Sequence, residues 1–239
     1  MPVALITGGS AGLGLALATQ LAERGWDLII DARGEPGLRT AATALGPRTR
    51  AVRGDVADPD HRRELAELAA GFGALDLLVN NASDLGPSPL PALAGYPLTD
   101  LEIVYRVNAL APLGLIQLTL PLLVAARGTV VNISSDAAVE SYPGWGGYGS
   151  SKAALDQLTA GLGTELGATH PDLRIYGFDP GDLRTDMHQR AFPGEDISDR
   201  PEPSTVVPAL LRLIEDRPPN GRYRDADLPR PATVPGSPS

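Results

Sequence analysis

Near its amino terminus the chain reads Val3-Ala-Leu-Ile-Thr-Gly-Gly-Ser-Ala-Gly-Leu-Gly14. The apolar run Val3 to Ile6 predicts a short buried strand, and apolar residues recur at helical spacing from about Leu15 to Arg24. The glycines between them let the backbone approach a pyrophosphate, and the helix N-terminus offers N–H groups and a positive dipole end. We therefore predict a dinucleotide site here, with a plain tight turn as the alternative.

A second motif, Tyr148-Gly-Ser-Ser-Lys152, places a phenol and an ammonium four residues apart at the start of a helical pattern. At this spacing both side chains are expected on one helix face, one turn apart. A neighbouring Lys+ favours the phenolate, so we expect the pKa of Tyr148 to be lowered toward the range of an acid–base catalyst. Alone, the motif also fits a half-buried tyrosine beside a solvated lysine.

The glycine spacing is TGxxxGxG rather than the common GxGxxG. Together with Tyr148 and Lys152, it resembles the short-chain dehydrogenase/reductase family in its smaller, single-domain form. The resemblance extends from about Val3 to about Tyr223, and its motifs occur in the family's order. It implies an enzyme that interconverts a carbonyl and a secondary alcohol on a small organic substrate with a nicotinamide cofactor.

Short apolar runs alternate with helical patterns along the whole chain. Strands are predicted at 3–6, 27–30, 50–52, 75–79, 129–134 and 174–178, and the family adds a seventh at 221–223. Helices are predicted at 15–24, 38–45, 61–70, 101–126, 151–169 and 204–215. This alternation predicts an α/β fold: a single-domain, Rossmann-type, doubly wound parallel sheet with helices on both faces. We assign residues 1–224 to that domain and expect the Pro-rich residues 225–239 to form a flexible tail.

Composition limits the remaining classes. A chain of 239 residues suits one domain, and the absence of cysteine excludes disulfides and thiolate metal ligands. The net charge of −9 argues against nucleic acid and anionic membrane surfaces as partners. Because Pro112, Gly114, Gln117 and Pro121 interrupt the apolar run 110–126, we expect no membrane span. A strand in place of a signal peptide favours a cytoplasmic enzyme, and the scattered histidines indicate no metal site.

Ligands of doubly wound sheets bind beyond the carboxyl ends of the strands. The resemblance places the cofactor on residues near those ends: Gly8, Ser10, Gly12, Leu13, Gly14, Arg33, Asp55, Val56, Asn80, Ala82, Tyr148, Lys152, Pro180, Gly181, Leu183 and Thr185. Asp55 would accept from the adenine amino group, although an Asp just before Asp58-Pro59 also fits a helix N-terminus. Ser83 stands where the family has glycine, and it would be strained if the turn needs a positive φ.

The end of the second strand, Leu28 to Arg33, is where the family distinguishes its two cofactors. Ala32 stands where NAD-dependent members tend to have an acid, and Arg33 is placed to pair with a 2′-phosphate. We therefore predict NADP(H) rather than NAD(H). Two features weigh against this choice: Asp31 is close enough to hold Arg33 or the ribose, and Ala11 stands where many NADP-dependent members have a second base.

The resemblance implies four catalytic residues: Asn108, Ser135, Tyr148 and Lys152. Ser135 is preferred to Ser134 because its spacing to Tyr148 matches the family, and it would orient the carbonyl oxygen. Tyr148 would exchange the proton, and Lys152 would hold the nicotinamide ribose. Asn108 would hold a water that links Lys152 to solvent.

The substrate end is less defined. Residues 186–203 show no periodicity and are predicted to form a lid-like loop, with a surface excursion as the alternative. Met187, Phe192 and the segment 142–145 are candidates for the substrate wall, although Tyr142 and Trp145 equally fit core or interface aromatics. The family also implies a homodimer or homotetramer through the helices at 151–169 and 204–215.

Three other functions stay open on this fold. The first is a regulator that binds the dinucleotide without chemistry, although such proteins typically lose the Tyr or the Lys. The second is an epimerase or dehydratase of the larger branch, which usually carries TGxxGxxG. The third is a family member that uses the same site for non-redox chemistry, since a fold does not fix a reaction.

Overall fold

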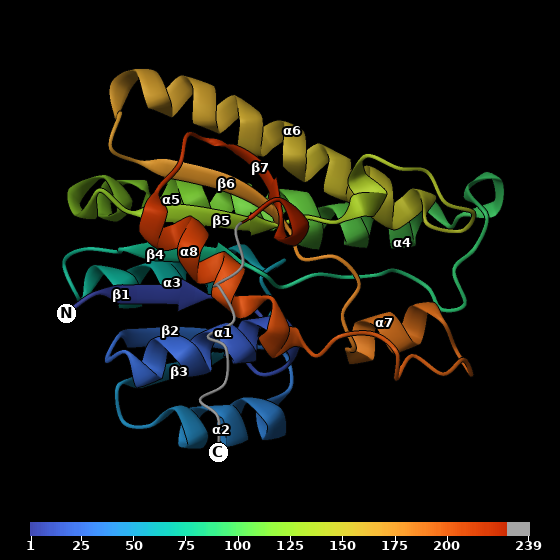
Figure 1. Cartoon of the computed structure of the whole chain (residues 1–239), viewed down its shortest axis with the longest axis horizontal. Helices are drawn as coiled ribbons and strands as arrows, with labels where there is room; N and C mark the ends of the chain where they lie inside the picture. Colours follow the sequence, from blue (N-terminus) through green and yellow to red (C-terminus); the bar gives the residue numbers. More distant parts are fainter. Residues whose placement is uncertain (229–239) are drawn as a thin grey trace, which may run out of the picture.

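The computed structural model describes residues 1–228. Within them, seven parallel strands form one sheet in the order β3-β2-β1-β4-β5-β6-β7 (Figure 1). The strands are β1 Val3–Ile6, β2 Asp27–Ala32, β3 Thr49–Arg53, β4 Leu77–Asn80, β5 Thr129–Ile133, β6 Arg174–Asp179 and β7 Gly221–Arg224. The order reverses between β1 and β4, so a crevice is expected beyond their carboxyl ends. The predicted doubly wound fold is confirmed, including the seventh strand.

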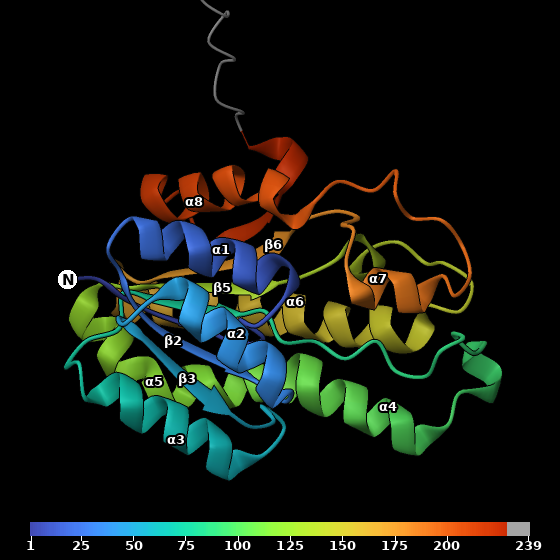
Figure 2. The ribbon, with the colours of Figure 1, turned by 90° about the horizontal axis from the view of Figure 1, so that it is seen from below.

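Helices cover both faces of the sheet (Figures 1 and 2). They are α1 Gly12–Glu23, α2 Glu35–Leu45, α3 Pro59–Ala70, α4 Leu98–Tyr105, α5 Ala111–Ala126, α6 Gly146–Thr169, α7 Asp186–Ala191 and α8 Val207–Asp216. One face carries α1, α2 and α8, and the other carries α3, α4, α5 and α6. α7 lies to one side, beyond the carboxyl ends of the strands (Figure 2).

β1 is apolar and buried at every position, because helices cover both faces of the sheet where it lies. In β1, Ala4 and Ile6 belong to the core under α1 and α8, whereas Val3 and Leu5 belong to the core under α3 and α5. This alternation follows from the two-residue period of a strand. It fixes the register, and so it fixes which residues reach the carboxyl edge, where the site lies.

The helix predicted at 101–126 is present and begins three residues earlier. It forms one continuous helix, Leu98–Ala126, in which α4 and α5 are joined by a π-helical turn, Arg106–Leu110. Pro112 lies in the first turn of α5, where a missing N–H is tolerated. By length and composition alone this helix could cross a membrane, so the expected interruption is wrong. Its buried face packs on α3 and the sheet, as in a core helix.

The segment 186–203, predicted as a loop, begins instead with the short helix α7. Thr185 caps it by accepting a hydrogen bond from the His188 backbone N–H at 3.1 Å. A helix of six residues is too short to show a helical repeat of apolar residues, so the sequence does not predict it. In the predicted tail, Asp225–Asp227 forms a 3₁₀ turn, and residues 229–239 lie outside the described residues.

Candidate active site

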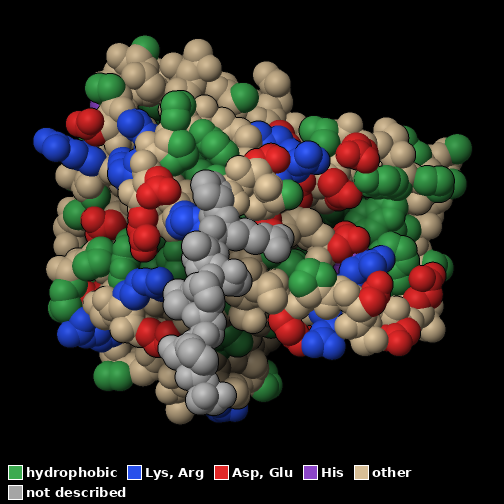
Figure 3. Space-filling view, in the orientation of Figure 1, with side chains coloured by type: hydrophobic (Ala, Val, Ile, Leu, Met, Phe, Trp, Pro, Cys, Tyr) green, Lys and Arg blue, Asp and Glu red, His purple; other side chains and the backbone are tan. Residues whose placement is uncertain are grey.

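The carboxyl ends of the strands border one large cavity of about 1060 Å³. It brings together most of the predicted site residues: Gly8, Ser10, Gly12, Leu13, Arg33, Ala82, Ser135, Tyr148, Lys152, Pro180, Gly181, Leu183 and Thr185. The remaining predicted residues do not line it: Gly14, Asp55, Val56, Asn80 and Asn108. Hydrophobic side chains gather in the hollow beside α7, with acidic side chains along its rim (Figure 3).

The glycine loop is packed against the end of β4. Asn81 donates through Nδ2 to the carbonyls of Thr7 and Gly8, at 2.9 and 3.2 Å. A Cβ on Gly14 would lie 2.6 Å from Asn81 Nδ2 and from Gly8 O, so only glycine fits there. Gly14 therefore shapes the loop from behind rather than facing the cavity.

The start of α1 faces the cavity and fits an anionic ligand. Ala11 occupies the N-cap and, among the described residues, no side chain caps the helix. Gly12 has φ +54°, a conformation that side-chain-bearing residues rarely adopt. Free N–H groups at the end of a 12-residue helix are the donor set that a pyrophosphate takes.

Asp31, the buried acid at the end of β2, supports the loop. Its Oδ1 accepts from Gly8 N at 2.7 Å, and its Oδ2 lies 2.9 Å from Nε2 of His61 on α3. The hydrogen bond with Asp31 raises the pKa of His61, although burial opposes the shift. Gly54 leaves room for the imidazole, since a Cβ there would overlap the ring. Both carboxylate oxygens of Asp31 therefore have partners other than Arg33. In the sequence, the only sign of the Asp31–His61 pair is an acid at the end of an otherwise apolar strand.

Arg33 reaches over the β2 end of the cavity. Its side chain is 61% exposed, and Nη1 lies 3.5 Å from Oδ2 of Asp84. A pair this exposed holds the guanidinium only weakly. Asp55 instead accepts from Ala57 N at 2.9 Å in a turn before α3, whose N-cap is Asp58. Its contact with adenine stays a prediction.

Three catalytic candidates meet at the other end of the cavity. Tyr148 and Lys152 lie in the first two turns of α6, and both are buried. Lys152 Nζ lies 5.6 Å from the centre of the Tyr148 ring and donates to Ile133 O at 2.7 Å. Ser83 and Ser135 lie beside the Tyr148 hydroxyl, and their side chains favour its phenolate. Residues that follow β4 and β5 therefore meet the first turn of α6 at the Tyr148 hydroxyl.

The ionisation of this group differs from its prediction. Burial raises the pKa of Tyr148 to about 12, and the hydrogen bonds from Ser83 and Ser135 only partly oppose it. Burial also lowers the pKa of Lys152 to about 8. The expectation of a lowered tyrosine pKa is wrong for the chain alone, because desolvation of the phenolate outweighs its neighbours.

Ser135 lies beside Tyr148 and lines the same cavity, and its catalytic role stays a prediction. Its Oγ also donates to Asp136 Oδ1 at 2.9 Å and accepts from Ala137 N at 3.2 Å. Ser134 is buried, and its hydroxyl has no hydrogen-bond partner among the described residues.

Asn108 lies in the π-helical turn, fully buried. Its Oδ1 accepts from Asp84 N and Ser83 Oγ, at 2.7 and 3.1 Å. Its Nδ2 donates to Asp84 O and Ser151 Oγ, at 2.8 and 3.0 Å. These four bonds saturate the side-chain amide, so a water at this place would have to bind the main chain.

Ser83 was missed as a site residue because it departs from the family's glycine. Its φ is not positive, so the turn carries no strain at this position. Its hydroxyl contacts both Asn108 and Tyr148. Ser83 thus links the loop after β4 to the phenol.

The side of the cavity next to α7 is lined by aromatic residues. Trp145 lies 5.7 Å from Tyr148 and 6.0 Å from Phe192, measured between ring centres. His188, which sequence reasoning missed, stacks on Phe192 at 4.9 Å. Tyr142 is more exposed, and its hydroxyl lies 3.0 Å from Asp136 Oδ2. α7 therefore closes one side of the cavity with apolar contacts, as expected for Phe192.

A helix N-terminus open to a phosphate, beside a buried Ser–Tyr–Lys group, defines a dinucleotide-dependent α/β oxidoreductase. The chain belongs to the short-chain dehydrogenase family: the sequence profile of that family, described as short chain dehydrogenase, matches residues 2–196. The resemblance that the motifs indicate is therefore confirmed.

Similar proteins agree in sequence and in fold. Serine 3-dehydrogenase of Agrobacterium fabrum is 35% identical over 185 residues, or 77% of this chain and 72% of the relative. A short chain dehydrogenase structure from Pseudomonas syringae superimposes with a TM-score of 0.87 at 30% identity, covering 93% of each chain. A short chain dehydrogenase from Escherichia coli CFT073, solved with NADPH, has a TM-score of 0.85 at 28% identity and covers 94% of this chain and 96% of that one.

Proposed function

We propose that this enzyme interconverts a carbonyl and a secondary alcohol on a small organic substrate, using NADP(H). One observation carries the proposal: a single cavity unites the uncapped start of α1, Arg33 and the Ser135–Tyr148–Lys152 group. Its volume of about 1060 Å³ suits a dinucleotide together with a small substrate. The NADPH in the similar Escherichia coli structure supports the choice of cofactor.

The residues of the cavity divide into two groups by the part of the cofactor that they would hold. The N–H groups of Gly12 and Leu13 would bind the pyrophosphate, and Arg33 would pair with the 2′-phosphate. At the other end, Lys152 would hold the nicotinamide ribose and Thr185 the carboxamide. The nicotinamide, when bound, supplies or accepts the hydride.

Tyr148 would donate the proton in carbonyl reduction and accept it in alcohol oxidation. With a pKa raised to about 12, Tyr148 is protonated at neutral pH and can donate to the oxygen of a carbonyl held against it. The Ser135 hydroxyl, in contact with the same phenol, would orient that oxygen. In alcohol oxidation Tyr148 must accept the proton, so this direction should need a higher pH.

A fluorescence titration tests the cofactor, with Trp26 and Trp145 as donors to the bound nicotinamide. NADPH should bind more tightly than NADH, and Arg33→Ala should remove that preference. Arg39→Ala is a matched control, because Arg39 is exposed on α2 and does not line the cavity. An unchanged preference in Arg33→Ala would overturn the role of Arg33. NADPH binding without consumption across a carbonyl panel would favour a dinucleotide-binding regulator.

We also propose a cytoplasmic homodimer or homotetramer. The apolar side chains of α8 are largely buried within the chain, which weakens the case for that helix as a contact. Exposed apolar side chains lie instead on the helix from Leu98 to Ala126: Leu98, Ile103, Leu110 and Leu118. A face of this kind, beside α6, is suited to a second copy. A monomer in sedimentation at micromolar concentration would contradict this assembly.

A further inference from the structure

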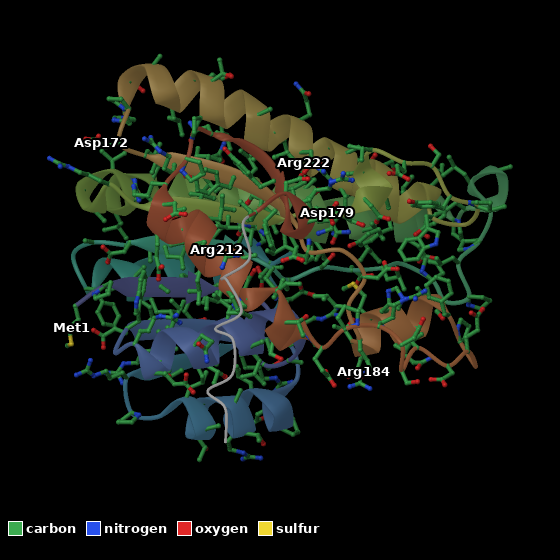
Figure 4. All side chains as sticks on the ribbon, viewed as in Figure 1. Met1, Asp172, Asp179, Arg184, Arg212 and Arg222 are labelled. Carbon is green, nitrogen blue, oxygen red and sulfur yellow. The ribbon has the colours of Figure 1, made fainter. Side chains whose placement is uncertain are left out.

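Behind the catalytic group, the side chain of Arg222 from β7 enters a nearly buried polar network (Figure 4). Its Nε donates to Asp156 Oδ2 at 2.9 Å. Its Nη2 donates to Asp179 Oδ2 and to the main-chain oxygen of Ser135, both at 2.9 Å. The Asp179 side chain is only 3% exposed. Charge-assisted hydrogen bonds of this length in a largely buried place hold their partners firmly.

Each partner of Arg222 belongs to a different part of the site. Asp156 lies one turn after Lys152 on α6. Asp179 ends β6, and its Oδ1 accepts from Gly181 N at 3.0 Å, at the start of the segment that lines the cavity. Ser135 follows β5 and contacts Tyr148. One guanidinium therefore ties together the three segments that carry the reacting groups.

The sheet makes room for this network. Gly177 of β6 lies opposite Arg222 in the register of β6 and β7. A Cβ on Gly177 would lie 3.3 Å from Asp156 Oδ1 and 3.8 Å from Arg222 Cγ. A side chain there would crowd the carboxylate, which accounts for a glycine inside an otherwise buried strand.

We propose that Arg222 is a positioning residue for the reaction of the proposed function, on which this inference rests. The hydrogen bonds of its guanidinium group fix the main chain of Ser135 relative to Tyr148 and Lys152. Its positive charge partly offsets the two carboxylates that lie behind them. Arg222 acts through these groups and does not line the cavity itself.

The charges around the catalytic pair set the sign of the effect. Tyr148 is influenced by Asp136, which follows β5, and by Asp179 of β6, and both raise its pKa. Lys152 is influenced by Asp156, which raises its pKa against the effect of burial. Without Arg222 both carboxylates are uncompensated, so the pKa of each catalytic group should rise. Alcohol oxidation, which needs the phenolate, should then move to higher pH.

Two substitutions separate geometry from charge. Arg222→Met removes both, so kcat should fall up to about 100-fold and the pH profile of oxidation should shift upward by about one unit. Arg222→Lys keeps the charge but cannot span all three partners, so kcat should fall while the pH profile stays in place. Adding Asp179→Asn to Arg222→Met should restore most of the profile, because Asp179 is the partner of Arg222 that raises the pKa of Tyr148, whereas Asp156 acts on Lys152.

Arg174→Met is the matched control. Arg174 starts β6 at the opposite edge of the sheet and donates to the main-chain oxygens of Arg217 and Pro171. Its loss should lower stability without moving the pH profile. If Arg222→Met behaves like Arg174→Met, Arg222 is only structural and the proposal is overturned. If Arg222→Met fails to fold, Arg222→Lys against wild type still decides: an unchanged kcat overturns the proposal.

If the proposed function is wrong, the experiment gives a result that differs from the failure of the Arg222 proposal. A wild-type chain that turns over no carbonyl substrate rejects that function. The Tyr148 titration can then be read from tyrosinate absorbance, as the difference between each protein and its Tyr148→Phe counterpart. A higher phenol pKa in Arg222→Met than in wild type supports the positioning role without turnover, and an equal value overturns it.

Discussion

The two ends of the cavity are built differently. At the glycine loop, buried polar groups hold the backbone: Asp31 accepts from Gly8 N, and Asn81 donates to Thr7 and Gly8. At the α7 end, partly buried rings pack on one another, such as Phe192 with Trp145 at 6.0 Å, and the Thr185 cap fixes only the start of the helix. The first end therefore fixes the main chain that faces the ligand, whereas the second mainly sets the shape of the cavity.

This difference separates two tasks of the site. Main-chain hydrogen bonds with buried partners tolerate few substitutions, since an unpaired buried group is costly. Ring contacts between half-buried side chains accept replacements of similar size. The loop end is therefore suited to one invariant ligand, and the α7 end to a substrate that can change between relatives.

The largest effect should come from the residue where the two ends meet. Tyr148→Phe keeps the ring that packs on Trp145 but removes the hydroxyl that lies beside Ser83 and Ser135. We expect turnover to fall by about 1000-fold or more, with NADPH binding nearly unchanged. Parallel turnover assays and titrations measure both. Tyr105→Phe is the control, because Tyr105 lies on α4 and does not line the cavity. Turnover surviving in Tyr148→Phe would remove the acid–base role.

A methyl group in the loop should have the next largest effect. In Gly14→Ala the new Cβ meets main-chain and amide atoms at 2.6 Å. We expect a loss of about 1–3 kcal/mol in the free energy of unfolding, together with weak NADPH binding. Gly37→Ala is the control, because nothing lies within 4 Å of its Cβ. Equal stability and binding in the two variants would show that the loop end is not tightly packed.

Behind the loop, the Asp31–His61 pair should give the loop end a pH dependence. The pKa of His61 is raised in the folded chain, so its stabilising effect is complete below the unfolded pKa of about 6.5 and is lost as pH rises through the folded value. Relative to His61→Gln, wild type should therefore lose stability as pH rises, by at most about 1.4 kcal/mol per unit. Urea unfolding at a series of pH values measures this difference. Parallel curves for the two proteins would mean that His61 does not titrate in this way.

The same contrast accounts for what the sequence could predict. The loop end is encoded by short-range motifs, so its strand, glycines and helix were predicted to within a few residues. The Asp31–His61 pair joins residues that are thirty positions apart, and the Arg222 network joins residues still further apart. The raised pKa of Tyr148 depends on burial, which the YxxxK spacing does not encode. α7 was missed because it is short and is held by tertiary contacts.

The smallest effect on the fold should come from the α7 end. Phe192 contacts Trp145 and His188 by ring packing and is only partly buried. Phe192→Ala should change the free energy of unfolding little, but it should raise KM for the carbonyl substrate and leave NADPH affinity unchanged. Steady-state kinetics with varied carbonyl substrate and with varied NADPH measure the two effects separately. Phe72→Ala is the control, because Phe72 is exposed after α3 and does not line the cavity. If Phe192→Ala instead weakened NADPH as strongly as the substrate, the two ends would share one task, and the contrast between them would not hold.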